Sequence, residues 1–180
     1  QTCALPIFTG EWSLAVKEAE ATNALADQGC DVVTCHVDGP KVICETAVSR
    51  DIFVCGYHAD QTPIAGDKYL TGAEWNWANV YTDMVAKTLA GEPIPNFVRG
   101  GLADGVIKMR PLGPAVSDAA RAQFEATKAE IEAGGFAAIK GPLKDNKGNV
   151  IAAEGESFVE TDVAIESMDY LVEGVIGSTS

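Results

Sequence analysis

A short apolar strand that runs into polar and aromatic residues constrains this sequence more than any other stretch. Residues 52–55 are continuously apolar and rich in β-branched or aromatic side chains, as in a strand inside a sheet. The chain then breaks at Gly56 and supplies four polar or aromatic side chains: Tyr57, His58, Asp60 and Gln61. Ligands of open α/β sheets bind beyond the carboxyl ends of the strands. A ligand site is best sought here, although on chemistry alone an ordinary polar turn explains these residues better.

Helix and strand alternate on the N-terminal side of this stretch. A helix is expected over residues 13–28, capped by its first serine, and a strand over residues 31–37 that buries Val32 and Val33. A proline begins a second helix at residues 40–47, which leads into the strand at residue 52. Helix, strand, helix and strand with short connections predict a parallel, doubly wound α/β sheet.

A longer amphipathic helix follows a short strand expected at residues 69–71. Gly91 and Pro93 end this helix, and residues 97–100 and 106–109 are expected to be extended. The apolar face of the helix has i, i+3 and i+4 spacing and consists of Trp77, Tyr81, Met84, Val85, Thr88 and Leu89.

The last third of the sequence predicts a helix, a hairpin and a final helix. Ser117 caps the first of these helices. Residues 139–143 and 149–152 flank a polar, glycine-containing turn that is typical of a hairpin. The final helix, capped by Thr161 or Asp162, is expected to bury four apolar residues: Ile165, Met168, Leu171 and Val172.

The excess of acidic residues excludes one class of partner. Asp and Glu number 26 against 13 Lys and Arg, which gives a formal net charge of −13. Nucleic acids repel a chain of this charge, so no nucleic-acid partner is expected. No apolar run approaches the roughly 20 residues that a membrane span needs. Apolar residues make up 47% of the sequence, which is ample for a packed core.

The cysteines give no sign of a metal site. The five of them stand at positions 3, 30, 35, 44 and 55, with no CxxC pair and no zinc-type spacing. Cys35 beside His36, and Cys55 three residues before His58, are conceivable ligands, but free cysteines are more often small buried hydrophobic residues. We therefore expect no metal and no cofactor.

Several islands of sequence, taken in order, resemble a single protein family. They are KEAEATNALADQGCDVV (17–33), TCHVDGP (34–40), GYHADQ (56–61), YLTGAEWNW (69–77), FVRGG (97–101), LGPAVS (112–117) and GPLKDNKG (141–148). Their order and spacing are similar to those of the basic membrane protein family of ABC-transporter substrate-binding lipoproteins, whose members include purine nucleoside receptors.

The resemblance implies the type I periplasmic-binding-protein fold, in which two Rossmann-like lobes hold the ligand between them. The expected fold class is α/β, a Rossmann-like three-layer lobe with a parallel sheet, and the N-terminal lobe is largely missing. Residues 9–62 and 97–152 would form the C-terminal lobe, and residues 63–96 a crossover segment that belongs to the N-terminal lobe. Residues 153–180 would be a C-terminal helix and tail, and residues 1–8 a non-native or disordered leader.

The same resemblance implies a binding protein and not an enzyme. It would capture a purine base or nucleoside and deliver it to an ABC permease, as a monomer at the periplasmic or extracellular face, anchored by lipid. A purine offers flat faces and a donor–acceptor edge, which suit aromatic plates and a few fixed polar groups. The expected ligand-binding residues are Trp12, His36, Asp38, Gly56, Tyr57, Asp60, Trp75 and Asn76. Of these, Asp60 and Trp75 are the residues most expected to touch the ligand.

One departure from the family pattern bears on the ligand. The resemblance implies that nucleoside-binding members carry an LTS motif and a lysine three residues later. In those members the lysine contacts the sugar. Here Leu70, Thr71 and Gly72 lack the serine, and Trp75 stands at the lysine position. The departure favours a free base such as adenine, or another flat heterocycle, over a nucleoside.

Two other functions stay open. The chain could be the ligand-sensing domain of a regulator, which shares the fold and binds a sugar or another small solute. It could also be an enzyme on a Rossmann-like sheet, with Asp60 or His58 as the acid–base group. The sequence contains no GxGxxG, GxSxG or P-loop motif that would support an enzyme.

Overall fold

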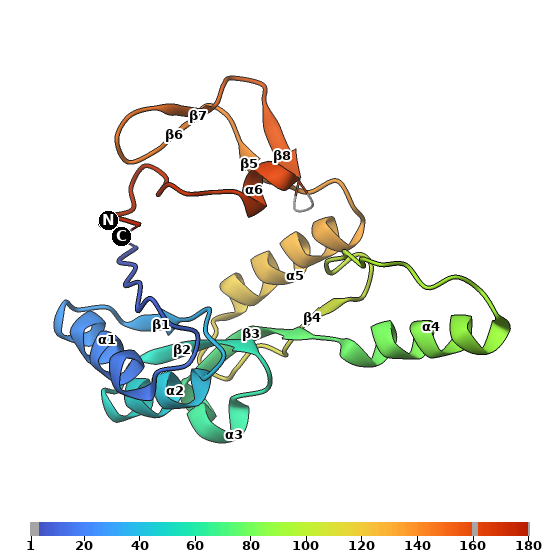
Figure 1. The fold of residues 1–180 in the computed structure, drawn as a ribbon. Helices are drawn as coiled ribbons and strands as arrows, with labels where there is room; N and C mark the ends of the chain where they lie inside the picture. The colour runs from blue at the N-terminus through green and yellow to red at the C-terminus, as the bar shows by residue number, and fades with distance from the viewer. Residues whose placement is uncertain (1–3, 160–161, 180) are drawn as a thin grey trace. The chain divides into compact units, whose positions relative to one another are not determined.

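The computed structural model describes residues 4–159 and 162–179, which divide into two compact units (Figure 1). The larger unit is Glu11–Glu132. The smaller unit combines the described residues of 1–10 with those of 133–180.

A four-stranded sheet with the strand order β1-β2-β3-β4 organises the larger unit. β1 (Val32–Thr34), β2 (Phe53–His58) and β3 (Tyr69–Trp75) are parallel to one another. β4 (Ile107–Met109) pairs with β3 in the antiparallel direction. The predicted parallel α/β sheet is confirmed for the first three strands, and β4 makes the sheet mixed.

Helices α1 (Ala15–Asp27) and α2 (Pro40–Ser49) pack against each other, and α2 packs on β2. Pro40 stands in the first turn of α2, as predicted. Val32 is 40% exposed although it was expected to be buried, because successive residues of a strand point to opposite faces and only Val33 faces the core. The buried core consists of Val33, Ile43, Cys44, Ala47, Ile52, Val54, Ala65 and Tyr69.

Helix α1 begins later than predicted and uses a different side chain at its start. Its N-cap is Leu14, which makes no side-chain cap bond, so the prediction for Ser13 is wrong. Glu18, which is 2% exposed, instead accepts a hydrogen bond from the Leu14 N–H through Oε1 at 2.9 Å. A buried carboxylate one turn into the helix therefore satisfies a backbone N–H at the helix start.

Strands β2 and β3 are both longer than predicted. β2 does not stop at Cys55 but continues through Gly56 to His58, and β3 reaches Trp75. The two strands pair along this extra length, where Tyr57 lies opposite Ala73. Tyr57 is therefore a strand residue and not a loop residue. After β2, the chain forms the short helix α3 (Thr62–Ala65) and a 3₁₀ turn, Gly66–Lys68.

Helix α4 (Trp77–Ala90) ends at Gly91, as predicted. Helix α5 (Asp118–Glu132) begins directly after Ser117, as predicted. Gly91 ends α4 with φ 72°, a left-handed conformation that glycine adopts without strain. Ser117 Oγ accepts a hydrogen bond from the Ala120 N–H at 3.3 Å at the start of α5. Residues 97–100 form no strand, whereas the predicted strand at residues 106–109 is confirmed as β4.

The smaller unit contains two pairs of short antiparallel strands. β5 (Ala137–Lys140) pairs with β8 (Ser157–Val159), and β6 (Leu143–Lys144) pairs with β7 (Val150–Ala152). The β6–β7 pair confirms the predicted hairpin at its turn, but Ile139 and Lys140 of the predicted first strand belong to β5 and pair with β8 instead.

The predicted long final helix is wrong. Only α6 (Val163–Glu166) is helical, and Asp162 is its N-cap residue, without a side-chain cap bond. Met168, expected to be buried on that helix, is 44% exposed, and Val172 forms a β-bridge with Asp145. Thr161, the alternative cap, lies outside the described residues. No helix in the described part of the chain is long and apolar enough to cross a membrane.

Candidate ligand-binding site

Three of the expected site residues form a row of rings at the carboxyl ends of β1 and β2. Trp12 and His36 meet edge to face with ring centroids 5.4 Å apart, and His36 and Tyr57 do so at 4.8 Å. Edge-to-face contacts at these separations are a favoured arrangement of aromatic rings. Because His36 lies between Trp12 and Tyr57, these two rings are not opposed plates that could hold one ligand between them.

Asp38 ties this row together through its backbone. Its N–H donates to the Trp12 carbonyl at 2.6 Å, and its carbonyl lies 3.3 Å from His58 Nε2. The segment before α1, the turn after β1 and the end of β2 are thereby held at one edge of the sheet. Burial and the Asp38 charge raise the pKa of the Tyr57 hydroxyl, and a hydrogen bond with Trp75 acts in the opposite direction.

A second row of rings begins at the end of β3. Trp75 and Trp77 stack with centroids 5.5 Å apart, and Trp77 and Tyr81 stack at 5.8 Å. Trp75, Trp77 and Tyr81 are 36%, 50% and 60% exposed. The helical spacing of Trp77 had suggested that its side chain is buried on the apolar face of α4, and this prediction is wrong. The Trp75 side chain is close enough to the Tyr57 hydroxyl to oppose the rise of its pKa, so the two rows lie near each other.

Asn76 is engaged within the protein. Its backbone N–H donates to the Val106 carbonyl at 2.8 Å, and its side-chain Nδ2 donates to the Gly105 carbonyl at 2.9 Å. Asn79 Nδ2 also reaches the Gly105 carbonyl, at 3.2 Å. The two asparagines therefore join the start of α4 to the residues that precede β4.

Gly56 contributes by having no side chain. A Cβ at this position would overlap Gln61 Oε1 and the Tyr69 ring and hydroxyl. Gln61 is 3% exposed and binds both backbone groups of Tyr57, which fixes the end of β2. Tyr69 is 2% exposed, and its burial, with the nearby Asp60 and Glu74 charges, raises the pKa of its hydroxyl to about 12.

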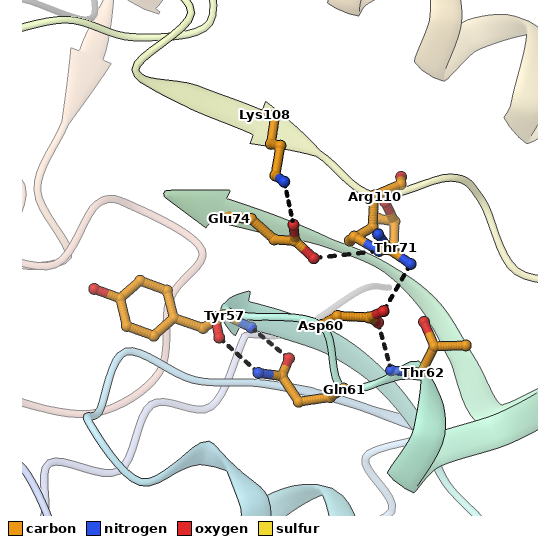
Figure 2. Close-up of polar contacts among 8 residues, drawn as sticks. All are labelled: Tyr57, Asp60, Gln61, Thr62, Thr71, Glu74, Lys108 and Arg110. Carbon is orange, nitrogen blue, oxygen red and sulfur yellow. Dashed lines mark hydrogen bonds and ion pairs between the residues drawn. The ribbon is translucent and has the colours of Figure 1, made fainter. Parts of the chain in front are cut away.

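Asp60 lies in the connection between β2 and α3, and both of its carboxylate oxygens are engaged (Figure 2). Oδ1 accepts a hydrogen bond from the Thr62 N–H at 2.9 Å, and Oδ2 lies 2.8 Å from Arg110 Nη2. The side chain is 37% exposed, so solvent still reaches it. Hydrogen bonds from Thr62, together with the Arg110 and Lys108 charges, hold the pKa of Asp60 below its ordinary value.

The ion pairs continue from Asp60 across the β3–β4 pair. Arg110 Nε lies 3.2 Å from Glu74 Oε1, and Lys108 Nζ lies 3.2 Å from Glu74 Oε2 (Figure 2). The Glu74 side chain is only 7% exposed. The Nε–Oε1 contact is an ion pair by distance, but these two atoms are not aligned as a hydrogen bond. Four alternating charges thus run from the loop after β2 to β4.

The expected ligand-binding residues did not include Glu74 or Arg110, whereas Gln61 had been noted in the polar stretch after the strand but given no role. Glu74 carried a signal, since it is a charged residue inside the otherwise apolar strand β3. Arg110 carried no such signal, because its partners Glu74 and Asp60 lie 36 and 50 positions earlier in the chain.

A groove of about 360 Å³ lies elsewhere in the larger unit, lined by α5, by Met109 of β4 and by Leu102 before that strand. It contains none of the residues expected to bind ligand. Its lining residues are Leu102, Met109, Ala120, Gln123, Phe124, Thr127, Lys128 and Ile131.

The described residues contain no group of three or more His, Cys, Asp or Glu side chains that could hold a metal ion. Cys44 is fully buried in the core, and Cys30, Cys35 and Cys55 are partly buried, all four as free thiols. Cys3 lies outside the described residues.

Solved structures with the same fold include solute-binding proteins. A transcriptional activator of the comK gene from Bacillus halodurans superposes with a TM-score of 0.67 at 23% identity, over 72% of this chain and 46% of the other. An ABC transporter solute-binding protein from Conexibacter woesei superposes with a TM-score of 0.54 at 21% identity, over 71% of this chain and 43% of the other. These likenesses define the class of α/β fold.

The chain belongs to the Bmp family, the PnrA-like ABC transporter substrate-binding proteins, whose family profile matches residues 7–135. A purine-binding protein of Brucella abortus is 31% identical over 94% of this chain and 47% of its own length. A putative ABC transporter glucose-binding protein of Haloferax volcanii is 28% identical over 88% of this chain and 37% of its own length. The chain thus spans half or less of the length of these curated relatives.

Proposed function

We propose that this chain supplies one wall of the ligand cleft of an ABC importer's substrate-binding protein, and that the ligand is a purine base. The arrangement that carries the proposal is the row of Trp12, His36 and Tyr57 at the carboxyl ends of β1 and β2, with Trp75 at the end of β3 and Asp60 in the connection that follows β2. The Tyr57 ring meets the His36 ring with centroids 4.8 Å apart, and Asp60 follows the same strand. Flat rings and a fixed acceptor are what the faces and N–H edge of a purine require.

The choice of a base over a nucleoside rests on Trp75. The indole stacks on Trp77 at 5.5 Å and is 36% exposed, so one side is supported while part of the ring is accessible. An indole offers an apolar plate and a single donor, which match a heterocycle better than the hydroxyl groups of a ribose. The purine-binding relative from Brucella abortus supports the same class of ligand.

The opposite wall of the cleft belongs to a second lobe in this proposal. Residues 9–62 and 97–152 are assigned to the C-terminal lobe, and of the expected crossover segment 63–96 only the part after β3 reaches the other lobe, because β3 is an interior strand of the sheet described above. The exposure of the α4 side chains supports this division, since Trp77, Tyr81 and Leu89 are 50%, 60% and 84% exposed. Exposed apolar patches of a few hundred Å² or more generally mark an interaction surface.

The proposed protein binds and releases its ligand unchanged and passes it to a membrane permease. It works as a lipid-anchored monomer at the periplasmic or extracellular face of the membrane. The family to which the chain belongs is a solute-binding component of ABC transporters, which supports this role.

A sugar is the second candidate ligand, and one observation favours it. The Haloferax volcanii relative is named as a putative glucose-binding protein. Exposed indole rings, such as Trp75 and Trp77, also suit the apolar faces of a sugar ring.

Calorimetry with the full-length protein tests the proposal. The panel consists of adenine, guanine, hypoxanthine, their nucleosides and several hexoses. We expect tight binding of a base, weaker binding of its nucleoside and no turnover of either compound. Tight binding of a hexose with no response to any purine would establish the sugar alternative and refute the purine proposal.

A further inference from the structure

We propose that Arg110 is a positioning residue for Asp60, and that Glu74 holds Arg110 in place for this role. The inference deepens the proposed function and rests on it, since it requires Asp60 to contact the ligand. Neither Arg110 nor Glu74 belongs to the expected set of ligand contacts.

The backbone of Arg110 is fixed on both sides. Its N–H donates to the Gly72 carbonyl at 2.8 Å, and its carbonyl accepts a hydrogen bond from Thr71 Oγ1 at 2.9 Å. Both partners belong to β3, which is an interior strand of the sheet. The Cα of Arg110 therefore has a fixed position relative to β2 and β3, and only its side chain is left to be oriented.

Glu74 orients that side chain. Its carboxylate is 7% exposed and lies 3.2 Å from both Arg110 Nε and Lys108 Nζ. A buried carboxylate is strongly destabilising unless opposite charges compensate it, so Glu74 holds the two cations close. Arg110 Nε faces Glu74 while Nη2 faces Asp60, as Figure 2 shows. The planar guanidinium thus spans two carboxylates, a geometry that a lysine cannot reproduce.

Asp60 needs such a partner because it stands in the short connection between β2 and α3. Thr62 N–H fixes Oδ1 and Arg110 fixes Oδ2, so together they define the orientation of the carboxylate. Each carboxylate oxygen accepts more than one hydrogen bond, so both retain acceptor capacity for a ligand N–H. Loss of Arg110 releases one of the two contacts, and the ligand then has to order the carboxylate on binding.

The ion pairs also select the charge of the ligand. Asp60 and Glu74 balance Arg110 and Lys108, so the cluster presents an acceptor without net charge. A cation gains little at a carboxylate that an arginine already neutralises, whereas a neutral N–H donor still gains a hydrogen bond to a charged acceptor. The geometry therefore favours a neutral heterocycle with N–H groups over a cationic one.

A double-mutant cycle in the full-length protein tests the inference, with calorimetric titration of adenine, guanine and hypoxanthine. Asp60→Ala is expected to weaken binding at least ~10-fold, and Arg110→Ala at least ~5-fold. The double variant should bind no more weakly than Asp60→Ala alone, because Arg110 acts through Asp60. Arg110→Lys and Glu74→Gln should weaken binding in the same direction, and these conservative variants carry the test if Arg110→Ala does not fold.

Arg50→Ala is the matched control. Arg50 also forms an arginine–aspartate pair between two elements, with Asp27 of α1, but lies at the end of α2 away from the site. Its removal should leave the affinity unchanged.

Three results would overturn the inference. Losses for Arg110→Ala and Asp60→Ala that add in the double variant show that Arg110 supports the strands independently of Asp60. An unchanged affinity in Arg110→Ala shows that Asp60 does not depend on Arg110 for ligand binding, and in both cases the proposed function stands. A wild-type protein that binds none of the three bases refutes the proposed function and this inference with it.

Discussion

Gln61 binds both backbone groups of Tyr57. Its Nε2 donates to the Tyr57 carbonyl at 2.8 Å, and its Oε1 accepts from the Tyr57 N–H at 3.1 Å. On the side of β2 away from β3, pairing with β1 ends at Cys55, so the Gln61 amide takes the place of a β1 partner for Tyr57. The Gln61 residue is 3% exposed. The position of the Tyr57 backbone at the end of β2 follows from this pair of bonds.

Replacing Gln61 by alanine should therefore affect both stability and binding. Two partly buried hydrogen bonds are lost at about 1 kcal/mol each, so the free energy of unfolding is expected to fall by roughly 2 kcal/mol. Urea denaturation followed by circular dichroism measures this change. Gln28→Ala is the control, because the Gln28 amide makes one exposed bond to the Ala24 carbonyl. Equal free energies of unfolding for the two variants would show that the bonds between Gln61 and Tyr57 do not stabilise the fold.

Gly56→Ala should be more damaging than an ordinary glycine substitution. The new Cβ would overlap the Tyr69 hydroxyl, which is confined by its 2% exposure, and the Gln61 amide. Overpacking of this kind costs about 1–3 kcal/mol. In Gly39→Ala, the control, the nearest atom to the new Cβ is Ser13 Oγ at 3.3 Å, and φ is −112°. A Gly56→Ala protein as stable as the Gly39→Ala protein would contradict the close packing of β2 on Tyr69.

Trp75→Lys should shift ligand preference from the base to the nucleoside. The substitution removes a ring that stacks on Trp77 at 5.5 Å and introduces an ammonium group that can donate to sugar hydroxyls. We expect the ratio of base affinity to nucleoside affinity to fall by about 10-fold, or about 1.4 kcal/mol. Competition binding of adenine against adenosine in the full-length protein measures the ratio, with Trp77→Lys as the neighbouring control. An unchanged ratio would place the ligand away from Trp75.

The chain in isolation should self-associate through α4. Trp77, Tyr81, Val85 and Leu89 recur every four residues along the helix and are 50%, 60%, 58% and 84% exposed. Replacing Tyr81 and Leu89 by lysine should return the chain to a monomer in sedimentation velocity, because charges disfavour burial of this face. Val16→Lys, a single exposed apolar position on α1, is the control. A wild-type chain that sediments as a monomer across the accessible concentrations would count against a missing partner for α4.

Stability should decrease in alkaline solution because burial, which is complete for Cys44, nearly complete for Tyr69 and partial for Cys35, opposes deprotonation of these side chains. Burial raises the pKa of Cys35 to about 12, of Cys44 to about 11 and of Tyr69 to about 12. A group whose pKa is higher in the folded state stabilises the fold below its unfolded pKa and loses that contribution as the pH rises through the folded value. The loss therefore begins near pH 9 and continues to about pH 12.

Urea midpoints under reducing conditions at about pH 8 and about pH 10.5 measure this loss. Cys44→Ala should reduce the difference between the two midpoints, since it removes one of the titrating groups. Identical wild-type midpoints at both pH values would contradict the predicted burial of these groups. The Cys44 thiol should also react more slowly with a thiol reagent than the partly buried Cys30 thiol.

Local signals in the sequence predicted the features that depend on neighbouring residues. Pro40 at the start of α2, Gly91 at the end of α4 and Ser117 before α5 each act within one turn of their own position. The lengths of β2 and β3 could not be obtained in this way. They depend on pairing between the two strands, in which His58 meets Glu74 across the sheet.

The candidate site shows the same limit. The family resemblance grouped Trp12, His36, Asp38 and Tyr57 as expected ligand contacts, and the four residues lie near one another in the structure. It did not indicate that His36 separates the rings of Trp12 and Tyr57, since this depends on side-chain orientation. It also gave no partner for Asp60, because Arg110, which directly follows β4, lies 50 positions later in the chain.

The bonds of Asn76 have a topological consequence. Asn76 N–H meets the Val106 carbonyl immediately beyond the last β3–β4 pair, in which Trp75 lies opposite Ile107. The polypeptide between Asn76 and Val106, helix α4 included, therefore leaves and re-enters the sheet at one point and is, for the sheet, the loop of a hairpin. A tight glycine-containing turn grafted in its place should preserve the strand register. The binding wall and the segment that reaches out from it are separable parts, which can be exchanged or resized without re-forming the sheet.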